Sequence, residues 1–387
     1  MDNALADRVR ARLADLGSRG LLRRLRLPAG IDLSSNDYLG LADHPRVTRA
    51  FASAAAAGCG STGSRLLRGH REAFADIERR FAAFKRTERS LYFSSGYLAN
   101  LALLATLPEA GDVVYSDALN HASLIDGLRL SRARRVVVPH ADPGALELMM
   151  AADACEGRRF VVVESVYSMD GDLAPLADYA AICRRFGAAL VVDEAHAVGI
   201  YGDDGSGLIR AAGVDDGVLL SINTAGKALG AAGAFVAGPA WAVDYLEQRA
   251  RTFVFSTAPP PAVAAAIDAA LDVVADEPER RARLLARARF LRERLAGEGF
   301  EQAAAGTSQI VPIVIGDNAA AVALAAALQA RGFDVRAVRP PTVPPGTARL
   351  RVSVNAGLTE EQLGRFAAAV RACLEEGAAE QCAAASS

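Results

Sequence analysis

The sequence contains very few lysines, few aromatic residues and no long apolar run. Of its 43 lysines and arginines only two are lysines, Lys85 and Lys227, and aromatic residues make up 6% of the chain. No stretch of about 18 uncharged apolar residues is present, so we expect no membrane-spanning helix. The net charge of −2 gives no basic excess for a general nucleic-acid-binding surface.

Cysteine is also scarce, and its spacing excludes several classes of site. Five cysteines form an odd set without a CxxC pair, which predicts neither a disulfide framework nor a cysteine metal site. The charged N-terminus lacks the apolar core of a secretory signal, so we expect reduced thiols in a cytoplasmic protein. The 387 residues, 51% of them hydrophobic, suffice for two or three domains.

The two lysines lie in very different sequence surroundings. Lys227 is in INTAGKALGAAGAF, among small apolar residues. Because arginine is this chain's usual cation, a lysine in that place suggests chemistry that guanidinium cannot perform, such as forming an imine. Lys85 lies in FAAFKRTERS, at the charged end of a helical pattern, which predicts a solvated surface charge.

Short runs rich in β-branched residues alternate with helical stretches of about 10–15 residues. Several runs are nearly continuous valine, which is typical of strands buried on both faces of a parallel sheet. The sequence therefore predicts an α/β fold with a mostly parallel seven-stranded sheet between helices. The expected strands are 90–94, 112–117, 134–140, 159–165, 188–194, 217–223 and 233–238.

The pattern predicts four consecutive segments. Residues 1–45 are expected to form an N-terminal helix, over 1–27, and an extended stretch. Residues 46–270 are the large sheet-containing domain, and residues 271–378 are a smaller C-terminal α+β domain whose last helix ends near residue 377. The Ala-rich tail, 379–387, is expected to be disordered.

Polar residues follow the predicted strands where ligands bind in open α/β sheets. Asp193 is the first polar residue after the valines of VVDEAH, and His196 follows three residues later. A buried carboxylate needs a partner, and the protonated ring nitrogen of pyridoxal phosphate (PLP) is a suitable one. DEAH also occurs in helicases, but neither lysine lies in the GxxxxGK[ST] sequence that such a function requires.

Further polar clusters follow other predicted strands. Gly96 and Tyr97 begin a helix whose N–H groups could bind a phosphate, and Thr224 offers a hydroxyl nearby in sequence to Lys227. Each cluster alone is more typical of a helix cap or a structural side chain, and we interpret His140 as structural. Together, the clusters follow the order used by PLP enzymes of the aspartate-aminotransferase fold.

Seven motifs together resemble the α-oxoamine synthases, PLP enzymes of fold type I that join an amino acid to an acyl thioester and release CO2. The resemblance covers residues 20–375 and implies a homodimer. The motifs are SSNDYLGL, SGYLAN, LNHASLIDG, ESVYSMDGD, VVDEAHAVG, TAGKALG and RPPTVPPGTARLR.

The last motif is most similar to family members that act in biotin synthesis on L-alanine and a pimeloyl thioester. The thioester carrier, CoA or acyl-carrier protein, is left open. Glycine with acetyl-CoA is an alternative pair of substrates in the same family, and a PLP aminotransferase would share the fold.

The resemblance implies a role for each matching residue. Lys227 is the Schiff-base lysine, Asp193 pairs with the ring nitrogen, and His121 stacks on the ring and faces substrate; these three are the implied catalytic residues. Ser256 and Thr257 reach the phosphate of the neighbouring subunit. The full implied cofactor-binding set is Gly96, Tyr97, His121, Ser168, Asp193, His196, Thr224, Lys227, Ser256 and Thr257.

The resemblance also implies substrate-binding residues and no metal site. Asn36 and Arg351 bind the amino-acid carboxylate, with His121 facing the substrate. Thr342 lies in a substrate-contacting loop, and Arg23 lies near the thioester entrance. The segment LRLPAGIDL is shorter than the hairpin common in the family, so we expect a different thioester entrance.

Overall fold

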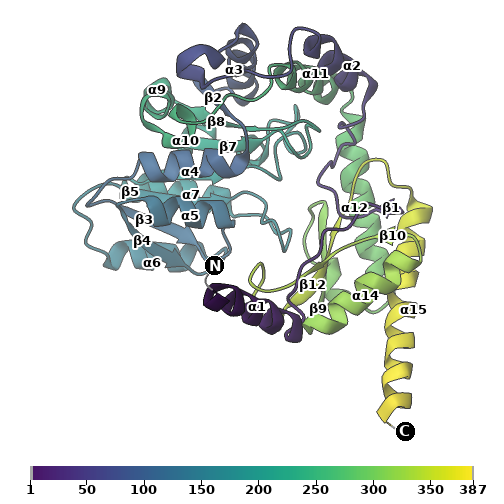
Figure 1. Cartoon of the computed structure of the whole chain (residues 1–387). Helices are drawn as coiled ribbons and strands as arrows, with labels where there is room; N and C mark the ends of the chain where they lie inside the picture. Colours follow the sequence, from purple (N-terminus) through teal and green to yellow (C-terminus); the bar gives the residue numbers. More distant parts are fainter. Residues whose placement is uncertain (1–2, 386–387) are drawn as a thin grey trace. The chain divides into compact units, whose positions relative to one another are not determined.

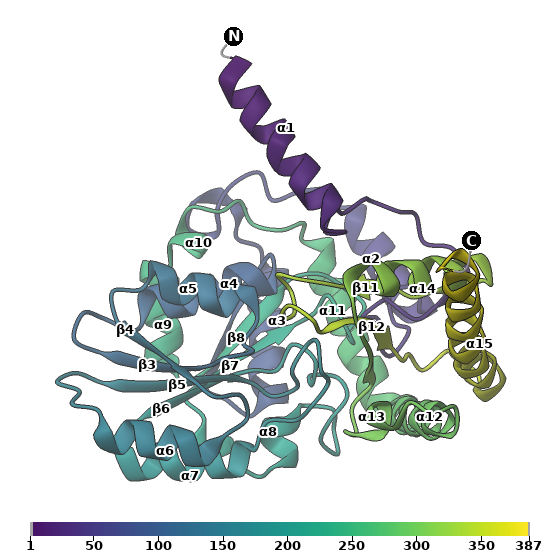
Figure 2. The same ribbon diagram turned by 90° about the horizontal axis from the view of Figure 1, so that it is seen from below.

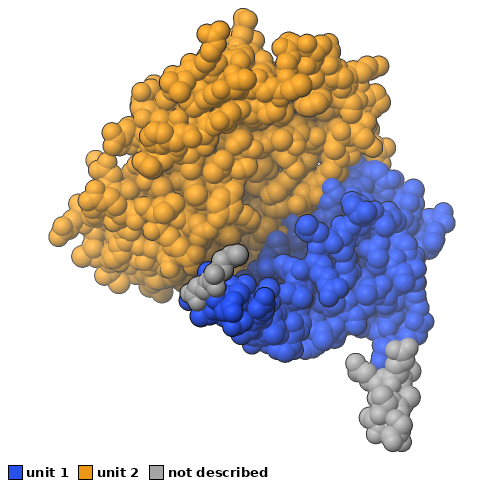
Figure 3. Space-filling model, viewed as in Figure 1, with its two compact units in different colours: residues 1–35, 169–171, 284–387 blue, residues 36–168, 172–283 orange. Residues whose placement is uncertain are grey.

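The computed structural model describes the backbone of residues 3–385 and the side chains of residues 3–377. The chain forms two compact units, coloured separately in Figure 3. Unit 2 comprises residues 36–168 and 172–283. Within the described residues, unit 1 comprises residues 3–35, 169–171 and 284–385.

Unit 2 is built on a seven-stranded sheet, which confirms the predicted fold. Five neighbouring strands run parallel, whereas β8 runs antiparallel to both of its neighbours, β2 and β7. In spatial order the strands are β2 (Arg89–Phe93), β8 (Ala234–Gly238), β7 (Leu220–Thr224), β6 (Ala189–Asp193), β5 (Arg159–Glu164), β3 (Val113–Asp117) and β4 (Arg134–Val138).

Helices cover both faces of this sheet, as the buried valine runs require (Figures 1 and 2). One core includes side chains of α4 (Gly96–Thr106), α5 (Ala122–Leu130), α9 (Ala240–Arg249) and α10 (Arg251–Val254). The other core includes side chains of α6 (Pro143–Ala152), α7 (Leu176–Phe186) and α8 (Leu208–Ala211).

The remaining helices of unit 2 lie beyond the β2 side of the sheet. α3 packs against β2 and β8, and α11 packs against α2 and α3. Their bounds are α2 (Pro45–Ala55), α3 (Glu72–Lys85) and α11 (Ala262–Asp276), with a short turn at Arg65–Gly69 between α2 and α3. Another short turn, Asp215–Gly217, packs against α7.

The described part of unit 1 contains a three-stranded antiparallel sheet, a separate strand pair and several helices. The sheet order is β11 (Ala337–Val338), β12 (Ala348–Ser353) and β9 (Ile310–Gly316). A separate pair joins β1 (Ile31–Asp32) to β10 (Phe333–Asp334). The helices are α1 (Asn3–Ser18), α13 (Glu301–Ala304), α14 (Asn318–Ala330) and α15 (Glu360–Ala385), and α12 (Glu279–Gly297) begins in unit 2.

Both terminal helices differ in length from the prediction. α1 ends at Ser18 rather than near residue 27, just before Gly20 adopts a φ of 63°, a left-handed conformation that terminates helices. α15 continues to Ala385 and so passes the predicted end near residue 377. The disorder expected for residues 379–387 stays a prediction, and residues 386–387 lie outside the described part. Among the described helices, none is long and apolar enough to cross a membrane.

The prediction of Lys85 as a surface charge is wrong. Lys85 is 8% exposed and forms an ion pair with Glu194, which is fully buried. The ammonium group also donates to the carbonyl of Ser206, and Glu194 accepts the N–H of Ile209 at 2.9 Å. This buried pair joins the end of α3 to the loop that follows the DEAH sequence.

We expect Lys85→Met to lower the free energy of unfolding by about 3–5 kcal/mol, because it leaves the buried Glu194 carboxylate without its cation. Adding Glu194→Gln should recover part of that loss. Urea denaturation measures both effects. Arg79→Met is the matched control, because the ion pair of Arg79 with Asp76 is exposed and should contribute within about 1 kcal/mol. Equal losses for Lys85→Met and Arg79→Met would contradict the assignment.

Candidate active site

A cavity of about 350 Å3 lies in unit 2 at the carboxyl ends of the parallel strands. It brings together seven of the predicted cofactor residues: Gly96, Tyr97, His121, Asp193, His196, Thr224 and Lys227. Four other polar residues line it as well: Ser95, Asn100, Ser123 and Glu164. The motifs that are separate along the sequence therefore meet in one cavity.

One end of the cavity is the N-terminus of α4. Ser95 caps the helix by accepting the N–H of Leu98 at 3.3 Å, which leaves the N–H groups of Gly96 and Tyr97 without intrahelical partners. A Cβ at Gly96 would lie 2.6 Å from Thr224 Cγ2. Glycine therefore allows the helix end and Thr224, the last residue of β7, to approach as closely as an anion-binding site requires.

Asp193 ends β6 and is 4% exposed. Its Oδ1 accepts the N–H of Ala195 and its Oδ2 accepts from Asn100 Nδ2, both at 2.8 Å. These two donors fix the carboxylate in one orientation, with lone pairs left on each oxygen. The geometry suits an acid that faces a protonated nitrogen in the cavity.

Lys227 begins a chain of hydrogen bonds that ends at Asn36. Its Nζ lies 2.8 Å from His196 Nε2, and His196 Nδ1 lies 2.7 Å from the Tyr38 hydroxyl. Tyr38 donates to Asn36 Oδ1 at 2.9 Å. The tyrosine hydroxyl therefore accepts the Nδ1 proton of His196, so Nε2 is the acceptor for the lysine N–H.

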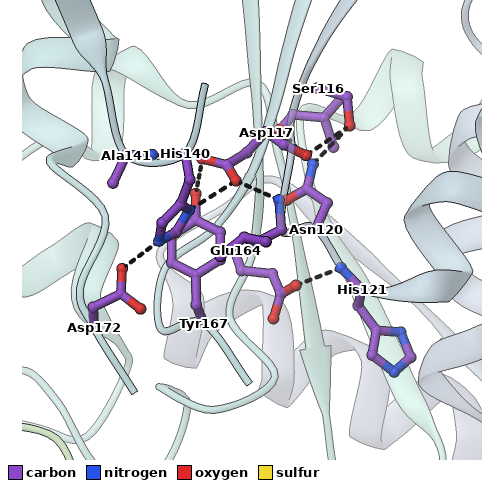
Figure 4. Close-up of polar contacts among 11 residues, drawn as sticks. Ser116, Asp117, Asn120, His121, His140, Ala141, Glu164, Tyr167 and Asp172 are labelled. Carbon is purple, nitrogen blue, oxygen red and sulfur yellow. Dashed lines mark hydrogen bonds and ion pairs between the residues drawn. The ribbon is translucent and has the colours of Figure 1, made fainter. Parts of the chain in front are cut away.

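Glu164, the last residue of β5, forms hydrogen bonds with two loops that carry predicted cofactor residues. Its carboxyl group accepts the backbone N–H groups of His121 and Ser168 (the former is drawn in Figure 4). Complete burial, reinforced by the nearby Asp193 and opposed by Lys227, raises the pKa of Glu164 to about 8. At neutral pH this carboxyl group is mostly protonated, which avoids a second negative charge beside Asp193.

A second polar cluster lies beside Glu164 (Figure 4). His140 lies between two carboxylates, with Nδ1 2.9 Å from Asp117 and Nε2 2.9 Å from Asp172. Tyr167 donates to Asp117 at 2.8 Å. Burial opposes the charge on His140, but the two carboxylates outweigh it and raise its pKa to about 10. An imidazolium thus holds the loop of Tyr167 and Ser168 to the end of β3.

This cluster predicts a loss of stability at alkaline pH. Because the pKa of His140 is raised on folding from its usual 6.5 to about 10, its contribution is complete below pH 6.5 and disappears as pH rises towards 10. Allowing for solvent screening, we expect a loss of about 2 kcal/mol over that range. Denaturation at several pH values should show this slope in the wild type and a flatter one in His140→Asn. Parallel curves would contradict the ion pairs.

Four other predicted site residues of unit 2 are not among the residues that line this cavity: Asn36, Ser168, Ser256 and Thr257. Ser256 and Thr257 follow α10, where Thr257 pairs with Ser64 in an isolated β-bridge. In unit 1, Arg23 donates to Thr342 at 3.3 Å. Arg351, 8% exposed on β12, donates to Ser353 at 2.7 Å. The substrate and partner-subunit contacts assigned to these residues stay predictions.

Three side chains of the site were missed by sequence reasoning. Tyr38 lies within SSNDYLGL, two residues after Asn36, and its hydroxyl was not assigned. Asn100 is four residues after Gly96, hence on the same helix face, a spacing that could have indicated it. Glu164 is the last residue of a valine-rich strand, the same signal that identified Asp193.

Comparison with known proteins identifies the family of this chain. The class I and II aminotransferase family model matches residues 28–370. The 8-amino-7-oxononanoate synthase of Burkholderia cenocepacia (strain HI2424) is 45% identical over 97% of each chain. The chain belongs to the 8-amino-7-oxononanoate synthase family, within the class I and II aminotransferases. The predicted family is therefore confirmed.

Two solved structures show the same fold. A serine palmitoyltransferase variant from S. paucimobilis, with a bound PLP–myriocin adduct, is 29% identical with a TM-score of 0.89, covering 96% of this chain and 98% of that one. An 8-amino-7-oxononanoate synthase from Francisella tularensis is 28% identical with a TM-score of 0.78, covering 90% and 98% respectively. The PLP in the first structure agrees with the cofactor predicted for this family.

Proposed function

We propose that this protein is a PLP-dependent acyltransferase of biotin biosynthesis. It condenses L-alanine with a pimeloyl thioester, on CoA or acyl-carrier protein, to give 8-amino-7-oxononanoate, CO2 and the free thiol. The observation that carries the proposal is a cavity that combines Lys227, Asp193 and the α4 N-terminus in a chain 45% identical to a named synthase.

The residues of the cavity fit PLP. The close approach at Gly96 and the helix N-terminus suit its phosphate, and the Asp193 carboxylate suits its ring nitrogen. The Lys227 amine suits its aldehyde. When bound, PLP supplies an electron sink for the carbanion formed at the α-carbon of the amino acid.

Each of these residues has a defined task. Lys227 would hold the cofactor through its amine and would take the α-proton of the amino acid. His196 accepts an N–H of Lys227 and is itself oriented by Tyr38, so the amine is directed before substrate binds. Asp193 holds the proton on the ring nitrogen. His121 lines the cavity and is held at its backbone by Glu164.

Turnover measurements with matched substrates test the proposal. The purified protein is given L-alanine or glycine with pimeloyl-CoA, pimeloyl-acyl-carrier protein or acetyl-CoA, and products are identified by mass. We expect the highest kcat/KM for L-alanine with a pimeloyl thioester. A preference for glycine with acetyl-CoA would assign another reaction of the same kind. Conversion of keto acids without any thioester would assign an aminotransferase.

The enzyme is further proposed to act as a cytoplasmic homodimer. In support, Phe255 is 72% exposed beside Ser256 and Thr257, and Leu67 is 84% exposed in the turn that follows Ser64. Such apolar side chains are typical of a surface covered by a partner. Sedimentation at low protein concentration should show a dimer, and Phe255→Asp should weaken it. A stable, active monomer would exclude the proposal.

A further inference from the structure

Asn100 is buried between two functional groups of the cavity. It is 2% exposed, and its Nδ2 donates to Asp193 Oδ2 and to Ser123 Oγ, both at 2.8 Å. The opposite amide orientation would place Oδ1 against the Asp193 carboxylate, so the repulsion between oxygens fixes the orientation. Both amide hydrogens are thereby used. Within the described residues Oδ1 has no hydrogen-bond partner, a cost that indicates selection for the two donated bonds.

Ser123 connects Asn100 to His121 through hydrogen bonds. The backbone N–H of Ser123 lies 3.2 Å from His121 Nδ1, a long hydrogen bond that favours an unprotonated Nδ1 without fixing it. Ser123 Oγ lies 2.7 Å from the same nitrogen, and because it already accepts an N–H of Asn100 its hydroxyl hydrogen is directed towards Nδ1. The hydroxyl lone pairs then face Asn100, whose N–H needs an acceptor. These contacts favour one direction for each hydrogen between Asp193 and His121.

We propose that Asn100 is a positioning residue that sets the protonation pattern of the cavity. It directs the Ser123 hydroxyl hydrogen to His121 Nδ1, which holds this histidine neutral with its remaining proton on Nε2. His121 consequently presents an N–H donor, and not a lone pair, at Nε2. The same amide fixes the Asp193 carboxylate, so one side chain orders both the stacking histidine and the acid.

The charges that face His121 agree with a neutral ring. Burial is the largest influence and lowers its pKa; Asp193 on β6 raises the pKa, and Lys227 after β7 lowers it. Glu164 on β5 contacts the backbone N–H of His121 and is mostly protonated at neutral pH. The ring is therefore uncharged near pH 7, and only its tautomer is left for Asn100 and Ser123 to decide.

Nitrogen-15 NMR on the protein without cofactor tests this inference directly. The chain has five histidines, so His121→Gln identifies the His121 signals by their loss. We expect a single neutral tautomer with a protonated Nε2 and an unprotonated Nδ1. A wild-type protein with the proton on Nδ1 would overturn the inference. The inference concerns a residue of the proposed function, but this measurement requires no turnover, so the two can fail separately.

Two variants test whether the hydrogen bonds from Asn100 through Ser123 to His121 set the tautomer of His121. Asn100→Ala frees the Ser123 hydroxyl to rotate, and we expect signals of the second tautomer to appear. Ser123→Ala removes a donor to the neutral ring and should shift the protonation of His121 to higher pH. Asn223→Ala is the matched control, because buried Asn223 also donates to a serine, Ser221, at 2.9 Å, and neither residue lines the cavity.

Asn223→Ala should leave the His121 signals unchanged. If folded Asn100→Ala keeps the single wild-type tautomer, the backbone N–H of Ser123 alone sets it, and Asn100 has no such role. If Asn100→Ala does not fold, Ser123→Ala tests the same hydrogen bonds. An unchanged pH of His121 protonation in Ser123→Ala would overturn the inference.

Discussion

Replacing Lys227 by alanine is expected to reduce turnover by a factor of at least about 10³ while the fold persists. We expect the half-buried lysine to have two roles, attaching the cofactor and transferring the α-proton, and alanine can fulfil neither. The substitution removes a side chain that donates to His196 but leaves the His196–Tyr38 bond in place. Circular dichroism should therefore stay native, whereas the visible absorbance of the lysine–cofactor linkage should disappear.

The scarcity of lysine provides an unusually clear control. Borohydride treatment of the PLP-loaded protein followed by peptide mapping can label only Lys85 and Lys227 among the lysines. Lys85 is 8% exposed and held by Glu194, so its amine is not available to the cofactor. We expect the label on Lys227 alone. A label on Lys85 would reject both the cofactor assignment and the buried ion pair.

The sheet and the cavity were predictable because their signals are local. A run such as FVVVE has the composition of a strand covered on both faces, whatever lies elsewhere in the chain. Since parallel strands end at one edge, the polar residues that follow them must gather there, as Asp193 and Thr224 do. The motif order then predicted which cofactor such a cavity holds.

The buried partners were not predictable because they are distant in sequence. Lys85 has the local pattern of a charged helix end, and only the position of Glu194, 109 residues later, makes it a buried cation. Tyr38 gains its role from His196, 158 residues away. Local periodicity carries no information about such pairs, which depend on how the elements pack.

The sharpest test of the electrostatics is Asp193→Asn. The substitution keeps the volume of the side chain and removes its negative charge, so a protonated ring nitrogen loses the opposite charge that favours it. We expect α-proton abstraction from alanine to slow by a factor of about 10³, which corresponds to about 4 kcal/mol of transition-state stabilisation. Cofactor binding should weaken far less, because Lys227 and the α4 N-terminus are unchanged.

A loss of stability must be separated from this loss of rate. Asp193 accepts two N–H groups, from Ala195 and Asn100, and an asparagine amide would turn its own donor towards one of them. Asp112 provides the matched control: it is also a buried carboxylate that accepts two N–H groups, here the backbone ones of Glu109 and Arg158, but it lies just before β3 begins. Asp112→Asn should lower stability and retain the exchange rate.

Deuterium exchange at the α-carbon of alanine, measured on folded protein, decides between the two roles. If Asp193 acts through its charge, exchange falls in Asp193→Asn well beyond any change in the folded fraction, and Asp112→Asn exchanges at the wild-type rate. If Asp193 only caps its strand, the two variants behave alike, with reduced stability and normal exchange, because both lose the same kind of hydrogen bond. That second result would remove Asp193 from the chemistry.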